Sequence, residues 1–343
     1  QVARLAGVHP STASRALNEA TRDLVRADTV ERIVAAASTL GYKPNYLARS
    51  FKTRRTLSIG VVIPDINNPL FPPIVRGVED RLAKAGYLAL IANVESDPER
   101  EQRIFDELTS RQVDGLVLAT AKREDPVLIR LSHHGVPLVL VNRVVDDHTF
   151  SSVSVDDGAA VRLVVDHLAR LGHRRIGHIA GPQPLSTGFG RYRGFVTSMR
   201  ANSLVPDSHL VSFAHSYSIA EGIRCGDELL GLADPPTAVL AANDMLALGC
   251  YTAMEALGLA CPGDVSIVGF NDMPFIDRLD PPLTTVRIPA YDIGFQAAEL
   301  MVERIDRPEA PLKVLLLAPE LVVRHSTAPP RAARPARAQT ALT

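Results

Sequence analysis

The chain has 343 residues, of which 46% are hydrophobic and 22% are charged. Because a domain typically holds about 150 residues, this length indicates two packed domains, or three if one is small, and the composition excludes a disordered or fibrous protein. No stretch reaches the roughly 18 consecutive apolar residues of a membrane span, and the N-terminus lacks a secretory signal pattern. The three cysteines have no close spacing, which suits a reducing compartment, so we expect a cytoplasmic protein.

The net charge of −1 conceals an uneven distribution. Residues 1–56 carry ten Lys and Arg against four Asp and Glu, residues 57–326 carry 24 against 34, and the last 17 residues add three arginines. A basic segment can bind nucleic acid, but it can equally be a solvated charged face. The arginines of the first segment are interspersed with apolar residues at helical spacing, which favours a folded nucleic-acid-binding domain.

Three helices are predicted in the basic segment. The first ends at Gly7, which can adopt the left-handed conformation of a tight turn, and the second begins at Pro10, whose missing N–H costs nothing in a first turn. The third is predicted over Asp28–Leu40, with an apolar stripe at Val30, Ile33, Val34, Ala37 and Leu40. The second helix presents small polar side chains and one arginine, which suit the major groove of DNA: Ser11, Thr12, Ser14 and Arg15. This pattern predicts a helix-turn-helix domain, with a small helical cap as the alternative.

From Leu57 onward, apolar strands alternate with helices. Strands are predicted over Leu57–Pro64 and Leu88–Val94, each followed by a helix. Further short apolar runs begin at the following positions: Val113, Pro137, Ile176, Ala238 and Val265. Nearly continuous apolar strands separated by helices are typical of parallel sheets that are covered on both faces. The sequence therefore predicts an α/β body.

Short motifs of the first segment occur in a characteristic order. They are Val2-Ala3, Ala6-Gly7-Val8, Ser14-Arg15, Asn18, Leu40-Gly41-Tyr42, Pro44-Asn45 and Ala48-Arg49. In these motifs the chain resembles the lactose-repressor and galactose-repressor family of bacterial transcription regulators. The resemblance implies an N-terminally truncated helix-turn-helix domain over residues 1–44. It also implies a hinge helix and linker over residues 45–56, with the helix folding when two subunits bind operator DNA.

The resemblance extends to individual DNA-binding residues, to a homodimer and to a palindromic operator. It assigns Ser11, Thr12, Ser14, Arg15, Asn18, Asn45, Ala48 and Phe51 to the DNA interface. Phe51 stands where the family inserts a leucine into the minor groove, so a bulkier apolar wedge is expected here.

Seven motifs of the body continue the resemblance. They are Val113-Asp114-Gly115, Leu171-Gly172-His173, Gly181-Pro182, Gly190-Arg191, Ala242-Asn243-Asp244, Val268-Gly269-Phe270 and Pro282-Leu283-Thr284-Thr285. They imply a body over residues 57–326 made of two doubly wound lobes, like a type I periplasmic binding protein. Lobe one is expected over about 57–156 and 289–316, and lobe two over about 157–288 and 317–326. Residues 327–343, rich in Ala, Pro and Arg, are expected to be a disordered tail.

Polar and aromatic side chains near the predicted strand ends are candidates for ligand binding, because open α/β sheets bind ligands there. By resemblance, the effector-binding residues are Phe71, Thr187, Arg191, Tyr217, Asn243 and Asn271. The aromatic rings would form the walls, and the amides and the guanidinium would anchor hydroxyl groups of a sugar, nucleoside or related polyol. Asn271 stands where the family commonly has aspartate, which favours a neutral or anionic ligand over a cationic one. A turn-forming or helix-capping role is the alternative for the asparagines.

Enzyme functions find no support in the motifs. The glycine-rich segment at Gly188–Gly194 has neither dinucleotide-fingerprint spacing nor a Walker lysine, no Gly-x-Ser-x-Gly elbow occurs, and the histidines lack metal-ligand spacing. We therefore expect no catalytic site, no metal and no cofactor. Two hypotheses remain: a ligand-responsive DNA-binding repressor, and a sugar-binding protein of the same fold that acts in transport or chemotaxis. The basic helical segment favours the repressor.

Overall fold

The computed structural model describes residues 1–17, 19–42, 55–133 and 135–331 of the chain. The chain divides into two compact units, residues 1–56 and 57–343. Three residues of the predicted hinge helix, Asn45, Ala48 and Phe51, lie outside the described residues, and so does Asn18.

The first unit is helical. Its helices are α1 (Val2–Leu5), α2 (Pro10–Ala16), α3 (Glu19–Arg22) and α4 (Ala27–Thr39). Gly7 has a φ of +64° and forms the turn between α1 and α2, as predicted. The short helix α3 was not predicted, and the expected apolar stripe of α4 is only partly buried. Ile33 and Ala37 lie in the core together with Ala36, whereas Val34 and Leu40 are exposed, because α4 turns only its Ile33 side toward α1 and α2.

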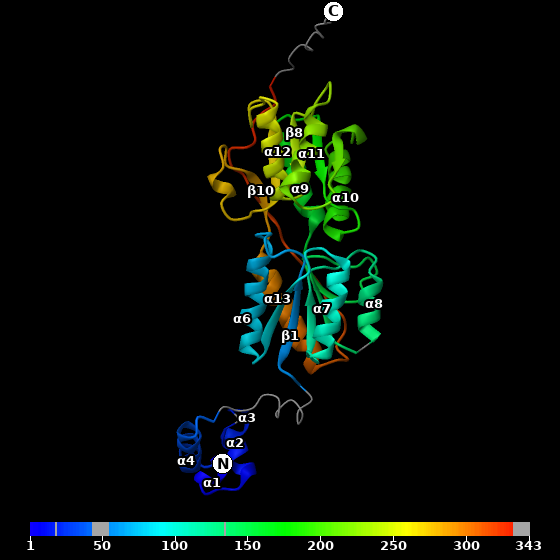
Figure 1. Cartoon of the computed structure of the whole chain (residues 1–343). Helices are drawn as coiled ribbons and strands as arrows, with labels where there is room; N and C mark the ends of the chain where they lie inside the picture. The colour runs from blue at the N-terminus through cyan, green and yellow to red at the C-terminus, as the bar shows by residue number, and fades with distance from the viewer. Residues whose placement is uncertain (18, 43–54, 134, 332–343) are drawn as a thin grey trace, which may run out of the picture. The chain divides into compact units, whose positions relative to one another are not determined.

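Two six-stranded sheets form the second unit, one in each lobe (Figure 1). In spatial order, the sheet of lobe one contains β11 (Val314–Leu317), β5 (Ser151–Val155), β4 (Leu138–Val141), β3 (Gly115–Leu118), β1 (Ser58–Ile63) and β2 (Leu88–Asn93). All its neighbouring strands are parallel. The sheet of lobe two contains β12 (Glu320–Val322), β10 (Thr284–Arg287), β9 (Ser266–Asn271), β8 (Ala238–Ala241), β6 (Ile176–Ala180) and β7 (Val211–Phe213). Only β12 is antiparallel to its neighbour.

Helices cover the sheets of both lobes. Lobe one has α6 (Phe71–Lys84), α7 (Pro98–Ser110), α8 (Pro126–His133) and α13 (Ala290–Asp306). Lobe two has α9 (Asp157–Arg170), α10 (Ser186–Ala201), α11 (Ile219–Leu230) and α12 (Asp244–Ala256), with the short 3-10 helices Ser208–Leu210 and Ile276–Arg278. Figure 1 shows α13, from late in the sequence, beside α6. These two helices meet backbone to backbone, because a Cβ on Gly77 would lie 2.1 Å from the Tyr291 carbonyl oxygen.

The strand order of each lobe reverses direction next to its first strand, between β1 and β3 in lobe one and between β6 and β8 in lobe two. Such reversals create crevices at the carboxyl ends of the strands, where open α/β sheets bind ligands. The predicted fold class, a helical head followed by a two-lobed α/β body, is confirmed. The chain passes between the lobes after β5, after β10 and between β11 and β12.

The structure differs from the expected disordered tail at Thr327–Arg331. The carbonyl oxygen of Ala328 lies 2.9 Å from His173 Nε2, its N–H donates to Ser266 Oγ at 3.1 Å, and Arg331 pairs with Asp264 at 2.8 Å. These bonds fasten the segment to lobe two, an outcome that its composition could not indicate. Among the described residues, no helix is both long and apolar enough to cross a membrane.

Candidate functional site

A pocket between the lobes is lined by all six of the predicted effector-binding residues. It is lined by Asn68, Leu70, Phe71, Asn142 and Arg143 of lobe one and by Thr187, Arg191, Tyr217, Asn243 and Asn271 of lobe two. They lie close together because each follows a strand or ends one at the crevice edge of its sheet. The side chains leave a cavity of only about 10 Å³ among them, roughly the room that one water molecule needs.

Arg191 of α10 is the most constrained side chain of the pocket. Arg191 is 2% exposed. Its Nε donates to Asp157 Oδ1 at 2.8 Å, and a second guanidinium nitrogen donates to the Ala242 carbonyl oxygen at 2.5 Å. The guanidinium also lies over the Phe270 ring, 3.6 Å from its centroid. Burial raises the pKa of Asp157, although the neighbouring Arg191 opposes that shift. Arg191 is therefore a structural element of lobe two as well as part of the pocket wall.

Tyr217 and Phe71 form the aromatic walls. The Tyr217 hydroxyl donates to Thr187 Oγ1 at 3.1 Å, and burial raises the pKa of this phenol. The ring fits because residue 181 is glycine, where a Cβ would lie 2.4 Å from the Tyr217 oxygen. Phe71 begins α6 and is only 1% exposed, so it also belongs to the hydrophobic core.

The two asparagines of lobe two differ in role. Asn243 is the N-cap of α12, with its side-chain oxygen accepting from the Leu246 N–H at 2.9 Å. The side-chain oxygen of Asn243 therefore has the helix-capping role named above as the alternative, and the side-chain nitrogen of the same residue is left to face the pocket. Asn271 has a φ of +118°, a strained conformation for a non-glycine residue, and its buried side-chain oxygen has no hydrogen-bond partner among the residues that the structure describes.

The strained segment after β9 is held by a buried carboxylate. Asp244 accepts from the Met273 N–H at 2.9 Å and from the Thr285 hydroxyl at 2.6 Å. Burial raises the pKa of Asp244 to about 6, against these hydrogen bonds. Asp272, which directly follows Asn271, forms ion pairs with Arg324 at 2.6 Å and with Arg287 at 2.7 Å. These contacts fix the direction in which Asn271 enters the pocket.

Asn142 and Arg143 were missed by the sequence analysis. They directly follow β4, so the strand-end rule could have found them had it been applied to the run that begins at Pro137. Asn142 has a φ of +65°. Within the described ranges, neither Asn142 Oδ1 nor Arg143 Nε, both buried, has a hydrogen-bond partner. Burial lowers the pKa of Arg143 to about 10, which still leaves the side chain charged at neutral pH.

Contacts between the lobes border this pocket. The Arg123 guanidinium of lobe one lies over the Phe189 ring of lobe two, 3.5 Å from its centroid, and the Arg123 N–H donates to the Pro184 carbonyl oxygen at 2.9 Å. The Val144 N–H donates to Ser186 Oγ at 2.9 Å. The described conformation is thus closed across the crevice.

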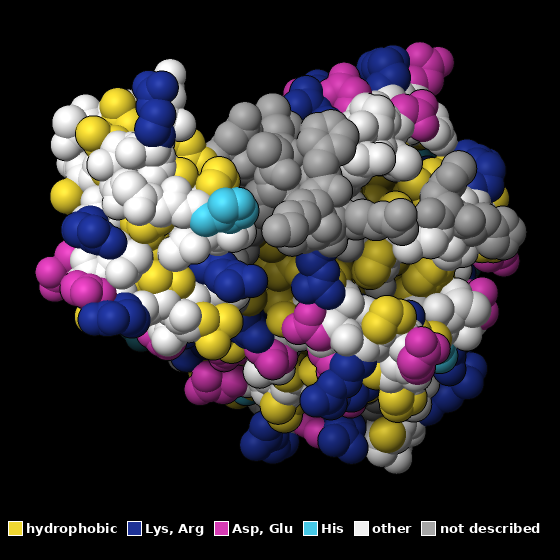
Figure 2. Space-filling model, turned by 90° about the horizontal axis from the view of Figure 1, so that it is seen from below, with side chains coloured by type: hydrophobic (Ala, Val, Ile, Leu, Met, Phe, Trp, Pro, Cys, Tyr) yellow, Lys and Arg dark blue, Asp and Glu magenta, His cyan; other side chains and the backbone are white. Residues whose placement is uncertain are grey.

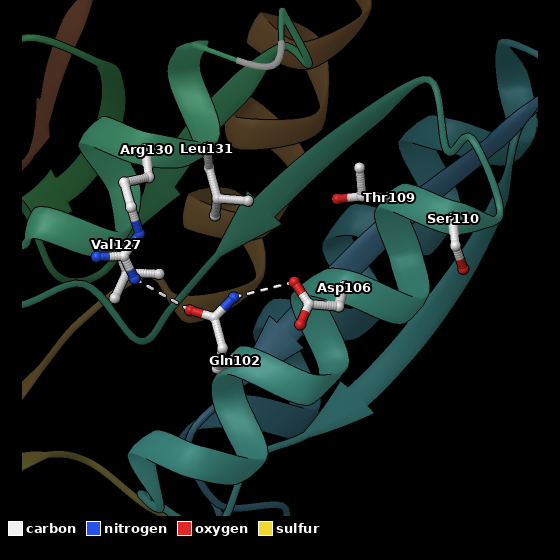
Figure 3. A pocket seen from close by; sticks show the side chains of 7 residues that line it. All are labelled: Gln102, Asp106, Thr109, Ser110, Val127, Arg130 and Leu131. Atoms are coloured by element: carbon white, nitrogen blue, oxygen red, sulfur yellow. Dashed lines mark hydrogen bonds between the residues drawn. The ribbon is translucent and has the colours of Figure 1, made fainter.

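A larger hollow, of about 340 Å³, lies on the surface of lobe one between α7 and α8 (Figure 3). Figure 3 shows Gln102 between Asp106 and Arg130, and its amide bonds to both at 3.0 and 3.1 Å. Gln102, Asp106 and Arg130 are already bonded to one another, and none of the predicted residues lines the hollow. We therefore regard the pocket between the lobes as the candidate site despite its smaller volume. Within the described ranges, no group of His, Cys, Asp or Glu side chains is placed to hold a metal ion.

The second helix of the head presents its predicted polar residues outward. Ser11, Ser14 and Arg15 are exposed and Thr12 is half-buried, whereas Ala13 and Ala16 lie in the core. The helix is fixed by the His9 side chain, which accepts from the Ser11 N–H at 3.3 Å. On the face that Figure 2 displays, Lys and Arg side chains are interspersed with Asp and Glu and do not gather in one patch.

A helix-turn-helix head joined to a two-lobed body with a crevice defines the class of ligand-responsive DNA-binding regulators. Comparisons with known proteins agree with this class. Residues 1–45 match the profile of bacterial regulatory proteins of the lacI family, and residues 165–327 match that of a periplasmic binding protein-like domain.

The relatives cover nearly the whole chain. The HTH-type transcriptional repressor CytR of Escherichia coli (strain K12) is 32% identical over 326 residues, which are 95% of each chain. The lac repressor dimer bound to operator and the anti-inducer ONPF has a TM-score of 0.84 at 28% identity, covering 95% of this chain and 98% of that one. The transcriptional regulator CelR in complex with cellobiose has a TM-score of 0.75 at 32% identity, with the same coverage. The chain therefore belongs to the lacI family of bacterial regulatory proteins, which are ligand-responsive DNA-binding transcriptional repressors.

Proposed function

We propose that this chain represses transcription as a cytoplasmic homodimer on a palindromic operator and is controlled by a small hydroxylated effector bound between its lobes. The observation that carries the proposal is the pocket itself, in which aromatic walls and buried amide and guanidinium groups from both lobes converge. Aromatic faces suit the C–H surface of a sugar, and amides suit its hydroxyl groups. The cellobiose complex of a relative of the same fold supports this ligand class.

The effector would act by changing the relative position of the lobes. A cavity of about 10 Å³ cannot hold a sugar, so binding requires the lobes to separate or pocket side chains to move. Arg123 and Val144 bridge the lobes in the closed conformation. A ligand whose binding breaks these contacts shifts the population from the closed to a more open conformation. Coupling of this kind typically amounts to about 1–3 kcal/mol, or roughly 5- to 150-fold in affinity for DNA.

On the DNA side, α2 would contact the major groove through Ser11, Thr12, Ser14 and Arg15, and Asn18 would join this interface. In the hinge, Asn45 and Ala48 would lie at the minor groove, with Phe51 as the wedge. The operator complex of the structurally similar lac repressor dimer supports this assignment. A role as a binding protein in transport or chemotaxis is disfavoured, because such a protein does not bind DNA and would not carry a lacI-type head. We propose no catalytic function.

The test measures both activities on the intact chain. A thermal-shift screen of sugars, nucleosides and polyols should yield a ligand that raises the melting temperature in proportion to the logarithm of its concentration. The same ligand should change operator affinity at least fivefold, and sedimentation at micromolar concentration should show a dimer. A monomer with and without DNA, or a ligand without effect on operator binding, would contradict the proposal.

A further inference from the structure

The two arginines of the pocket differ in their partners. Arg191 is paired with Asp157 at 2.8 Å and donates to a backbone carbonyl. Arg143 is also buried, at 9% exposure, but within the described part of the chain no carboxylate lies within 4 Å of its guanidinium. The buried Nε of Arg143 also finds no hydrogen-bond partner in that part of the chain. The pocket therefore holds one compensated and one uncompensated positive charge.

The charged surroundings of Arg143 act on it from a distance, without direct contact among the described residues. Glu101 and the Tyr217 phenol are the groups whose charges would favour the protonated guanidinium, and Arg191 opposes them. Burial raises the pKa of Glu101 and that of the Tyr217 phenol, and among the described residues neither group forms a hydrogen bond or an ion pair with Arg143. An uncompensated buried cation opposes folding, because transfer from water is not repaid by an ion pair. A residue that opposes folding at a binding site is explained most simply by an anionic ligand.

Two buried acceptors lie in the same pocket. Among the described residues, the side-chain oxygens of Asn142 and Asn271 have no hydrogen-bond partner, and both residues line the pocket with a positive φ. Unpaired acceptors require donors, which hydroxyl groups supply. The pocket thus combines one unpaired cation with two unpaired acceptors.

We infer that the effector is a small polyhydroxylated anion, whose carboxylate or phosphate group pairs with Arg143 and whose hydroxyl groups donate to Asn142 and Asn271. The inference rests on the proposed function, since it names the ligand class of the same pocket. A neutral sugar would leave the Arg143 charge uncompensated in the complex, and a cation would be repelled by both arginines.

The test compares three probes on the intact protein: D-glucose 6-phosphate, D-gluconate and neutral D-glucose, each by calorimetry up to 10 mM. At least one anion should bind at least tenfold more tightly than glucose, and the two anions distinguish phosphate from carboxylate recognition. Arg143→Gln should weaken anion binding at least tenfold, with partial recovery in Arg143→Lys. Arg130→Gln, which removes a surface arginine of the same lobe, should bind the anions as the wild type does.

A second measurement separates ligand binding from a structural role. Without ligand, Arg143→Gln should melt at or above the wild-type temperature, because the uncompensated charge is removed; a lower temperature would mean that Arg143 supports the fold. Binding of glucose as tight as that of the anions, no anion binding up to 10 mM, or anion binding unchanged in Arg143→Gln would overturn the inference. Operator binding measured in parallel distinguishes the outcomes, since a chain that binds operator and responds only to neutral sugars refutes the ligand class but not the repressor.

Discussion

Replacing Arg191 with methionine should destabilise the protein strongly, even in the absence of ligand. The change leaves the Asp157 carboxylate without its partner and the Ala242 carbonyl oxygen without its donor. Removing one member of a buried ion pair typically costs about 3–5 kcal/mol. The Asp157 side chain retains 16% exposure, so water can solvate part of its charge, and we expect a loss near the lower limit, about 3 kcal/mol.

The double variant Asp157→Asn/Arg191→Met tests this reasoning. The double variant leaves no unpaired charge. Its loss in free energy of unfolding should therefore be smaller than the sum of the losses in the two single variants by about 1–3 kcal/mol, the range of coupling between residues in contact. The assay is urea unfolding of the four proteins, followed by far-UV circular dichroism at one protein concentration. If the losses are additive within about 0.5 kcal/mol, the ion pair contributes nothing and the argument fails.

This result also decides how the ligand site can be probed. A loss of effector binding in Arg191→Met alone would not separate a missing ligand contact from a disturbed lobe two. The double variant keeps side chains of similar size and leaves no unpaired charge in lobe two, so a loss of ligand affinity in it is better attributed to the missing guanidinium contact. Equal ligand affinity in the double variant and the wild type would remove Arg191 from the effector site.

Three further predictions concern the head, the hinge and pH. If Arg15 contacts a phosphate, Arg15→Ala should flatten the slope of log operator affinity against log salt concentration by about one unit. If Arg15 contacts a guanine, the same change should reduce discrimination between operators by about 1–3 kcal/mol. No change in either quantity removes Arg15 from the interface. Phe51→Ala should reduce DNA bending and operator affinity, measured by gel mobility, while dimerisation and ligand binding stay intact; unchanged bending contradicts the wedge. Burial lowers the pKa of His178 from 6.5 to about 4, so its protonation favours the unfolded chain, and about 3 kcal/mol of stability should be lost as pH falls from 6.5 to 4. His178→Phe, which keeps a ring against Phe195, should weaken this pH dependence; an unchanged slope in urea titrations refutes the assignment.

Much of the architecture followed from local pattern. Apolar runs separated by helical segments predicted the strands from β1 to β4 and also β6, β8 and β9. Except for the half-buried edge strand β2, these strands are buried on both faces and are therefore apolar at nearly every position. The strand Ser151–Val155 was missed, since its serines are typical of a loop although the strand is fully buried. Ser151 Oγ accepts from the N–H of Lys313, 162 positions later in the chain, a contact that a local pattern cannot reveal.

The strand-end rule indicated the region, and the family resemblance nominated the six residues that the structure brings to one pocket. The sequence by itself also determined the turn at Gly7 and the helix start at Pro10, because φ preferences and missing donors are properties of single residues. What only the tertiary structure decided is which charges are compensated. Arg191 and Asp157 are 34 positions apart and meet because α9 packs on α10, whereas Arg143 follows β4 into the crevice without a carboxylate in reach among the described residues. Ion pairing depends on distances of a few ångströms, and packing sets those distances.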